Sequence, residues 1–317
     1  MSILATVGQA GQHLAGGMRR LQQRVRKRDW LVSLPFWLIP GAIMVLAVYG
    51  AIGWNFIISF TDFEGLRLPT YDVSQFDLEM YARMLGDPVF WTAVKNTIVF
   101  MLVFTTICLV VGLLLAILID QNIRFENTFR TIYLLPFALS FVVTAKFWMW
   151  MFNSDFGVIN TILRAIHLDF LAVTWLSPQF RLGSIIIALI WQFSGYSMIV
   201  YLAGLRQIPT EHYEAAVTDG ASLFSTYREV VIPQLGAATM SAAVVLMVFA
   251  LKAFDFIYAM FRLNPGPSAD ILSTMMYRTA FGAARWSYGA AIAMVLFGMA
   301  LVIISPYFYI QYRRGEL

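Results

Sequence analysis

The sequence has 317 residues, of which 60% are hydrophobic and 13% are charged, and its net charge is +4. Soluble domains usually carry about 25% charged residues, so this composition predicts a protein embedded in lipid, with room for about six spans of roughly 20 residues but none for a separate soluble catalytic domain. The single cysteine, Cys108, lies in an apolar run, which excludes a disulfide framework and a cysteine-rich metal site.

A basic segment comes before the first apolar run. Its cations are Arg19, Arg20, Arg24, Arg26, Lys27 and Arg28. Such a cluster could bind nucleic acid, but beside a membrane span it is more typical of a cytoplasmic topology determinant. The run that follows, residues 31–60, is too long for a signal peptide. We therefore expect residues 1–30 to be a cytoplasmic segment without a nucleic-acid partner, and residues 31–317 to form the membrane domain.

Six apolar runs are long enough to cross the roughly 30 Å hydrocarbon core of a bilayer as helices. They lie near residues 33–57, 95–119, 131–152, 183–205, 234–257 and 288–311. Prolines that can bend these spans are Pro35, Pro40, Pro136 and Pro306. Lys and Arg are more numerous in the segments on the side of the N-terminus. The sequence thus predicts an all-α, multi-pass protein of the inner (plasma) membrane, surrounded by lipid, with both termini in the cytoplasm.

The polar segment between the fourth and fifth runs, residues 206–233, has the most informative pattern. Pro209, followed by Glu211, is typical of a helix start, because an acid in the first turn complements the helix dipole. The helix should end at Gly220, and a second short helix should stop before Pro233. This segment either docks on a soluble partner or packs against the ends of its own spans, and its local pattern fits both interpretations.

In this segment Glu214-Ala215-Ala216 is followed by Gly220 and, after nine further residues, by Val230-Val231-Ile232-Pro233. This spacing resembles the EAA loop of binding-protein-dependent ABC importer permeases, with Val230 and Ile232 in place of the usual isoleucine and leucine. Other stretches resemble the carbohydrate permeases of this family, which are similar to the larger membrane subunit of the maltose transporter. These stretches are Lys95-Asn96-Thr97, Phe129-Arg130, Leu135-Pro136, 148–153, 157–160, 202–205, Ile208-Pro209, 254–258, 265–267 and 288–291.

The resemblance implies a type I ABC importer permease that works with a second permease subunit, a cytoplasmic ABC ATPase dimer and an extracytoplasmic solute-binding protein. It also implies that the loop couples to the ATPase through Glu214, Ala215, Ala216, Asp219, Gly220 and Ala221. The sequence has no Gly-x-x-x-x-Gly-Lys-Ser/Thr phosphate loop. We therefore expect a transport subunit that is not an enzyme and binds no cofactor itself, with ATP and Mg²⁺ on the partner ATPase.

Ionisable residues inside predicted spans are costly and point to a substrate path. Lys252 and Asp255 are three residues apart, so both should lie on one face of the fifth span. They either hydrogen-bond to a sugar, as the resemblance implies for this stretch, or form a structural ion pair. Lys146 lies close to a span end, where its ammonium group can reach the interface.

Aromatic residues complete the predicted path, because sugar rings stack on aromatic faces while hydroxyls need polar partners. The residues in stretches that resemble sugar-contacting parts of such permeases are Phe137, Phe141, Trp148, Gly195, Tyr196 and Phe254. Each of them could instead serve helix packing. Gly195 in particular could let a sugar ring approach the backbone.

The function expected from these features is import of a mono- or oligosaccharide, such as an α-glucoside, into the cytoplasm. The same architecture could carry another small polar solute, although phosphate would favour extra cations and a polyamine extra acids. An ion-coupled secondary carrier would need buried titratable relays, and a receptor or scaffold would bind without transport. His13, His167 and His212 have no metal-ligand spacing.

Overall fold

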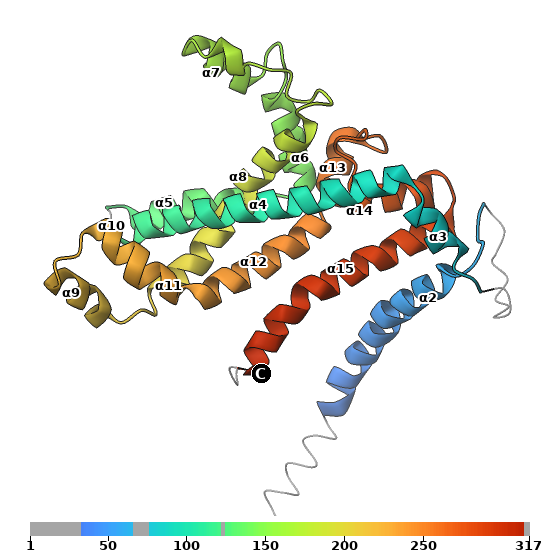
Figure 1. The fold of residues 1–317 in the computed structure, drawn as a ribbon, viewed down its shortest axis with the longest axis horizontal. Helices are drawn as coiled ribbons and strands as arrows, with labels where there is room; N and C mark the ends of the chain where they lie inside the picture. The colour runs from blue at the N-terminus through green and yellow to red at the C-terminus, as the bar shows by residue number, and fades with distance from the viewer. Residues whose placement is uncertain (1–32, 66–75, 122–123, 314–317) are drawn as a thin grey trace, which may run out of the picture. The chain divides into compact units, whose positions relative to one another are not determined.

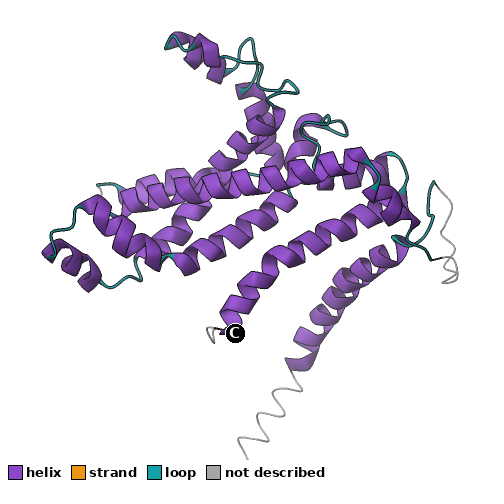
Figure 2. Ribbon diagram, in the orientation of Figure 1, coloured by secondary structure: helices purple, strands orange, loops and turns teal. Residues whose placement is uncertain are grey.

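The computed structural model describes residues 33–65, 76–121 and 124–313, so the basic segment 1–30 lies outside the described residues. Helices make up the regular structure of these ranges, and none of their residues is in a strand (Figure 2). The chain divides into two units, residues 1–57 and 58–317. The all-α prediction is confirmed.

In the first unit the described residues belong to one apolar helix, Ser33–Ile58, which is long enough to cross a membrane and extends to the first residue of the second unit. It includes a π-helical turn, η1 (Val45–Tyr49), and ends as α2 (Gly50–Ile58). Helical structure continues through Pro35 and Pro40.

The second unit has further helices of spanning length, shown as the long ribbons of Figure 1. They are α4 (Pro88–Asp120), α8 (Arg181–Leu205), the consecutive α12 (Gly236–Leu251) and α13 (Phe254–Phe261), and α15 (Trp286–Arg313). The Asp87 carboxylate accepts a hydrogen bond from Val89 N at 2.8 Å, which caps the start of α4. Pro306 lies inside α15 without ending it.

The third predicted span is sharply bent near Pro136, one of the prolines expected to bend the spans. It consists of α5 (Glu126–Leu134), η3 (Leu135–Ala138) and α6 (Phe141–Met151), with a bend of 100° between the residues 126–138 and α6. Pro136 cannot donate the backbone hydrogen bond that an α-helix requires at that point, and Leu139 is extended. Ser140 then caps α6 by accepting a hydrogen bond from Val143 N at 3.3 Å.

The fifth predicted span is also interrupted. A turn at Lys252 and Ala253 separates α12 from α13. Lys252 and Asp255 therefore do not share the face of one continuous helix, and the geometric basis of that prediction is wrong.

Shorter helices lie in the segments between the long ones. They are α3 (Glu79–Leu85), α7 (Val158–Ala165), η4 (Asp169–Leu171), α14 (Leu272–Tyr277) and η6 (Arg278–Gly282).

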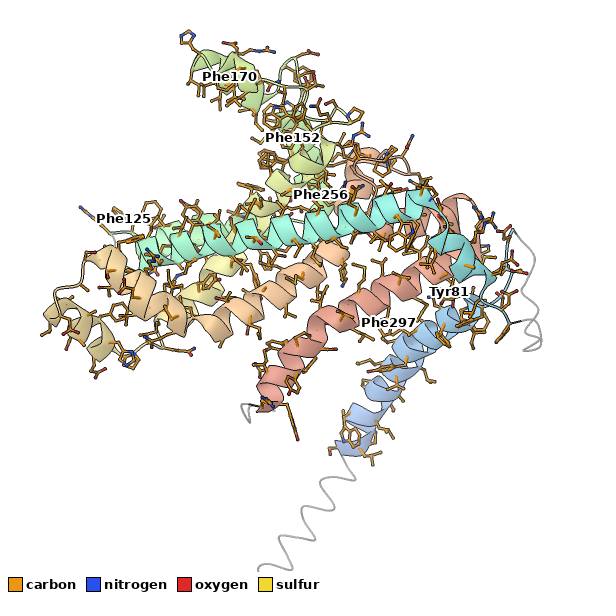
Figure 3. All side chains as sticks on the ribbon, in the orientation of Figure 1. Tyr81, Phe125, Phe152, Phe170, Phe256 and Phe297 are labelled. Atoms are coloured by element: carbon orange, nitrogen blue, oxygen red, sulfur yellow. The ribbon has the colours of Figure 1, made fainter. Side chains whose placement is uncertain are left out.

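The core of the second unit forms where α4 and α8 pack closely. A Cβ atom added at Gly112 of α4 would lie 2.2 Å from the Ser197 Cβ of α8, so the two backbones need glycine there. Large aromatic side chains fill the adjoining core, among them Phe152 and Phe256, which are almost fully buried (Figure 3). This packing holds in place the helices on either side of the breaks near residues 139 and 252.

Candidate functional site

The predicted coupling loop contains two helical segments separated by a tight turn. α9 (Thr210–Thr218) comes first and includes Glu214, Ala215 and Ala216. Gly220 has a φ of +78°, the left-handed conformation that ends many helices, and Ala221 N donates to Ala216 O at 2.9 Å. α9 lies beyond the ends of the long helices, at the left of Figure 1.

The second helical segment was predicted to stop before Pro233, but it continues past this residue. It runs through α10 (Leu223–Ser225), η5 (Thr226–Val231) and α11 (Ile232–Gln234). Pro233 lies next to last in this continuous helical run, which therefore extends past the proline to Gln234.

One face of the loop is turned inward and the other is open. Ala216 is buried, whereas Glu214, Ala215 and Asp219 are exposed. Apolar side chains are exposed beside them: Val217 by 69%, Leu223 by 64% and Phe224 by 75%. Large apolar side chains exposed on a polar loop are typical of a surface that another protein covers.

Aromatic and polar contacts fix the inward face of the loop to the ends of the long helices. The rings of Tyr213 and Tyr227 meet edge to face, with centroids 6.4 Å apart. Gln121 Nε2 donates to Tyr227 Oη at 2.5 Å. Burial, together with the nearby charge of Asp120, raises the pKa of Tyr213 to about 12, so this phenol stays neutral at physiological pH.

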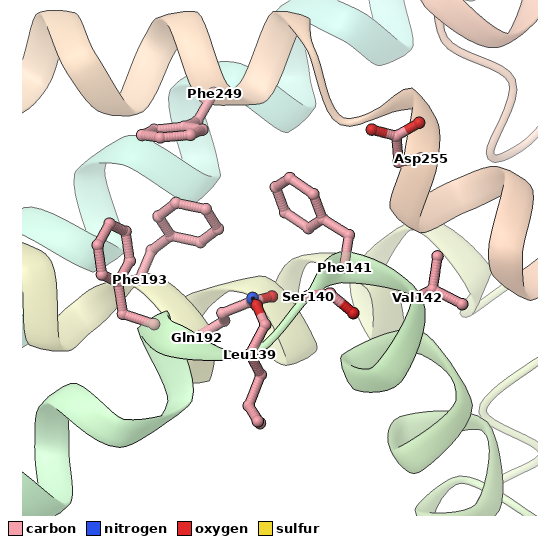
Figure 4. Close-up of a pocket in the computed structure, with 9 residues that line it drawn as sticks. Leu139, Ser140, Phe141, Val142, Gln192, Phe193, Phe249 and Asp255 are labelled. Atoms are coloured by element: carbon pink, nitrogen blue, oxygen red, sulfur yellow. Dashed lines mark hydrogen bonds between the residues drawn. The ribbon is translucent and has the colours of Figure 1, made fainter.

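A cavity of about 360 Å³ lies where the two broken spans meet α8 (Figure 4). This volume falls in the range of small-molecule sites. Its lining residues are Phe137, Leu139, Ser140, Phe141, Val142, Gln192, Phe193, Phe249 and Asp255. The breaks near residues 139 and 252 thus provide the lining from the third and fifth spans.

The walls of the cavity are mainly aromatic. Phe193 packs against Phe249 with ring centroids 4.8 Å apart and against Phe137 at 5.5 Å. Phe137 also stacks on Tyr196 at 5.5 Å, and Phe141 stacks on Phe193 at 5.9 Å. These faces suit the apolar side of a sugar ring.

Gln192 supplies a polar group that the sequence analysis missed. Its side chain is 2% exposed, and its Nε2 donates to Leu139 O at 2.8 Å. Its Oε1 has no hydrogen-bond partner among the described residues. A buried acceptor without a donor is costly, and a small rotation of the Gln192 amide toward the cavity that it lines would let a ligand hydroxyl satisfy it. The available signal was an amide inside the fourth apolar run, where polar groups are as informative as charged ones.

The structure brings part of the predicted path together. Phe137, Phe141 and Asp255 line the cavity. Tyr196 is not in the lining but stacks on Phe137. In the close-up the Asp255 carboxylate lies to the right of Phe141, on the side away from Phe249 (Figure 4).

Other residues of the predicted path lie elsewhere. Trp148 is buried against Phe152 and Trp191. Phe254 packs on Tyr277, with ring centroids 4.5 Å apart. Lys252 is exposed, and Lys146 is exposed with its Nζ 3.9 Å from a methionine sulfur, so neither ammonium group lines the cavity.

The structural ion pair considered for Lys252 and Asp255 is not formed. Within residues 33–65, 76–121 and 124–313, the ion pairs involve other side chains. Both residues are exposed. Any role they share must come from separate positions around the break between α12 and α13.

Gly195 permits a close approach, but of the chain's own backbone. A Cβ atom at this position would lie 2.0 Å from Tyr133 O, at the end of α5. The expectation that a sugar ring approaches here is therefore replaced by close packing of α5 on α8.

Long apolar helices, a projecting polar loop and a cavity at broken spans together define a membrane transport subunit. The chain belongs to the family of binding-protein-dependent transport system inner membrane components, whose model matches residues 108–312. Members are permease subunits of ABC importers and not enzymes, because a separate subunit carries the ATPase.

Several relatives are similar over most of their length. The xylose/arabinose import permease protein XacH of Haloferax volcanii is 54% identical, covering 91% of this chain and 90% of the relative. The trehalose/maltose transport system permease protein MalF of Thermococcus litoralis is 27% identical over 93% of this chain and 97% of its own. The lactose transport system permease protein LacF of Rhizobium radiobacter is 33% identical, with coverages of 73% and 79%.

Solved structures show the same fold. A chain from a bacterial ABC transporter involved in the import of the acidic polysaccharide alginate aligns with a TM-score of 0.75 and 24% identity. The alignment covers 93% of this chain and 99% of that chain. The type I importer architecture expected from the loop is confirmed at the level of the fold.

Proposed function

We propose that this chain is the transmembrane subunit of an ATP-driven importer that moves a neutral mono- or oligosaccharide into the cytoplasm. The observation that carries the proposal is the cavity, whose lining combines four phenylalanines with Gln192, Ser140 and Asp255. Aromatic walls with a few fixed polar groups suit a ring that has apolar faces and a rim of hydroxyls. The sugar names of the relatives support the same class of cargo.

The charge of the lining favours a neutral cargo over an ionic one. Asp255 is the charged residue of the lining, and no lysine or arginine among the described residues lines the cavity with it. A phosphate path would need cations, and a polyamine path would need several acids. The relatives are named for pentoses and for disaccharides, so an α-glucoside is one candidate within a broader sugar class.

The loop supplies the link to the energy source in this proposal. In this proposal the part of the loop that contacts an ATPase consists of Glu214, Ala215 and Ala216 of α9 and of the turn residues Asp219, Gly220 and Ala221. The exposed Val217, Leu223 and Phe224 give that contact an apolar centre, while Glu214 and Asp219 suit basic residues of the partner.

The assembly proposed around this chain has a second permease, an ATPase dimer that holds ATP and Mg²⁺, and an extracytoplasmic solute-binding protein. Residues 1–30 and the C-terminus lie in the cytoplasm, on the same side as the loop 206–233. Closure of the ATPase pair draws the two coupling loops together and turns the spans from inward-facing to outward-facing. The sugar enters from the binding protein and leaves inward after hydrolysis.

Reconstitution of this assembly in liposomes tests the proposal. Uptake of radiolabelled xylose, arabinose, maltose, trehalose and lactose is measured with MgATP on the ATPase side. We expect uptake of at least one sugar that depends on ATP and on the binding protein. Uptake that continues without ATP and stops when a proton gradient is collapsed would indicate an ion-coupled carrier. Binding without uptake of any sugar would indicate a receptor.

A further inference from the structure

One glutamate joins the start of the third span to the end of the fourth. Glu126 Oε1 accepts a hydrogen bond from Arg130 at 2.5 Å and another from Arg206 at 2.5 Å. Arg130 is one turn further along α5, whereas Arg206 directly follows α8 and begins the coupling loop. The Glu126 side chain is 23% exposed, so water screens these charge-assisted bonds only in part.

The segment that begins at Glu126 forms a wall of the cavity. We call residues 126–140 the strap; they comprise α5, η3 and the link to α6. Phe137, Leu139 and Ser140 of the strap line the cavity. A movement of the strap would therefore change the shape of the cavity.

The strap is attached to α8 at three levels. At the loop end Glu126 binds Arg206, and in the middle the backbone at Tyr133 rests on Gly195. At the cavity end Leu139 O accepts the hydrogen bond from Gln192. Because Arg206 follows α8 without a break, these attachments make the strap and α8 one body that begins at the loop.

Of the three attachments between the strap and α8, the one at Glu126 depends on charge. A single carboxylate oxygen holds two guanidinium groups, and the acid in the first turn of α5 also complements the helix dipole. Replacing the carboxylate with an amide would remove the anion that Arg130 and Arg206 share, while Asp120, whose charge interacts with Arg206, would remain as a nearby acid. The two guanidinium groups would then no longer be held by one carboxylate oxygen, and the start of the strap would be released from the loop.

We propose that Glu126 is a positioning residue that fastens the strap to the start of the coupling loop, so that a displacement of the loop by the ATPase reaches the cavity wall. The inference rests on the proposed function of the loop. It assigns Glu126, Arg130 and Arg206 a role in coupling that is separate from both ATPase docking and sugar binding.

The chain offers a matched control elsewhere in the second unit. Glu64 also lies between two arginines, with Oε1 3.8 Å from Arg83 and 3.2 Å from Arg285. These residues lie in segments that contribute nothing to the strap or to the loop 206–233. Glu64→Gln therefore removes the same kind of charge cluster without touching the proposed link.

The experiment measures how MgATP changes access to the cavity, with no need to know the sugar. Cys108 is replaced by Ser, and Val142→Cys then places the sole thiol in the cavity lining. The complete transporter is reconstituted, and the rate of maleimide labelling is compared with and without MgATP. The backgrounds are the unchanged chain, Glu126→Gln, Glu64→Gln and the charge exchange E126K with R206E.

We expect MgATP to change the labelling rate by about 5-fold or more, the lower end of typical coupling between sites, in the unchanged and Glu64→Gln backgrounds. Glu126→Gln should abolish this change, and the charge exchange, which keeps one acid between two bases, should restore part of it. A full response in Glu126→Gln overturns the inference alone. An equal loss in Glu64→Gln, or no restoration by the exchange, also overturns it. Absence of a response in the unchanged complex instead contradicts the proposed function.

Discussion

The coupling loop and the cavity place similar residue types in opposite surroundings. The loop, residues 206–233, turns apolar side chains such as Val217 and Phe224 outward, where a partner can cover them. The cavity is lined by aromatic side chains that pack on one another, and among the described residues an acceptor of the buried Gln192 has no partner. In the function proposed above, the loop binds a protein and the cavity binds a small polar molecule with apolar faces. α8 connects them, since it carries Gln192 and continues into the loop.

The largest effect is expected at the contact between α5 and α8, because α8 connects the loop with the cavity. In Gly195→Val, a side chain would overlap the Tyr133 carbonyl of α5, and overpacking of this kind costs about 1–3 kcal/mol or more. We expect loss of both assembly and uptake, measured as the yield of folded complex in detergent and as transport in liposomes. Gly183→Ala, also on α8 but with open space around it, is the control. A normal yield for Gly195→Val would contradict the close packing.

The next variant should separate ATP-driven uptake from sugar binding. Gly220→Val forces a branched side chain into a left-handed backbone conformation, which costs roughly 1–2 kcal/mol and should distort the turn after α9. We expect at least a tenfold loss of uptake with sugar binding to the solubilised complex retained. Gly236→Ala, in a helical conformation with free space, should behave as the unchanged protein. Loss of sugar binding in Gly220→Val would show that the two regions are not separate.

Removal of the cavity acceptor should weaken sugar binding and leave association with the ATPase intact. Gln192→Leu deletes the Oε1 that a sugar hydroxyl would contact, together with the Nε2 that donates to Leu139 O of the strap, and loss of one such hydrogen bond is worth roughly 1 kcal/mol. We expect KM for uptake to rise by about five- to tenfold while the ATPase still associates normally. Ser241→Ala, at the loop end of α12, provides a comparison outside this cavity. An unchanged KM would remove Gln192 from the sugar site.

The smallest effect is expected at Lys252. This ammonium group is exposed and does not line the cavity, whereas Asp255 does. Lys252→Met should change KM by less than about twofold, while Asp255→Asn should change it more, because a carboxylate accepts stronger hydrogen bonds from hydroxyls. A larger change in Lys252→Met than in Asp255→Asn would reverse the assignment.

The loop could be predicted from sequence because its features are local. Gly220 and the alanine pair lie within a few residues, and the turn that they form depends on their own backbone preferences. The prediction for Pro233 was wrong, because we expected the proline to end the helix and the helical run continues through it to Gln234.

The cavity could be predicted only in part because it is assembled from distant breaks. Pro136 indicated a bend, but hydropathy alone did not give the 100° change of direction. The same-face argument for Lys252 and Asp255 assumed an unbroken helix. Gln192 and the Glu126 link depend on which side chains meet across helices, and single-sequence periodicity carries no such information.

The most direct test of the central claim measures ATP-driven uptake with the loop altered at one exposed residue. Sugar uptake is compared between complexes with the unchanged chain and with Glu214→Ala, together with the amount of ATPase retained on the membrane. The account predicts that Glu214→Ala loses ATPase and uptake together while the chain remains folded and binds sugar. Full uptake by a Glu214→Ala complex from which the ATPase has been released would contradict it.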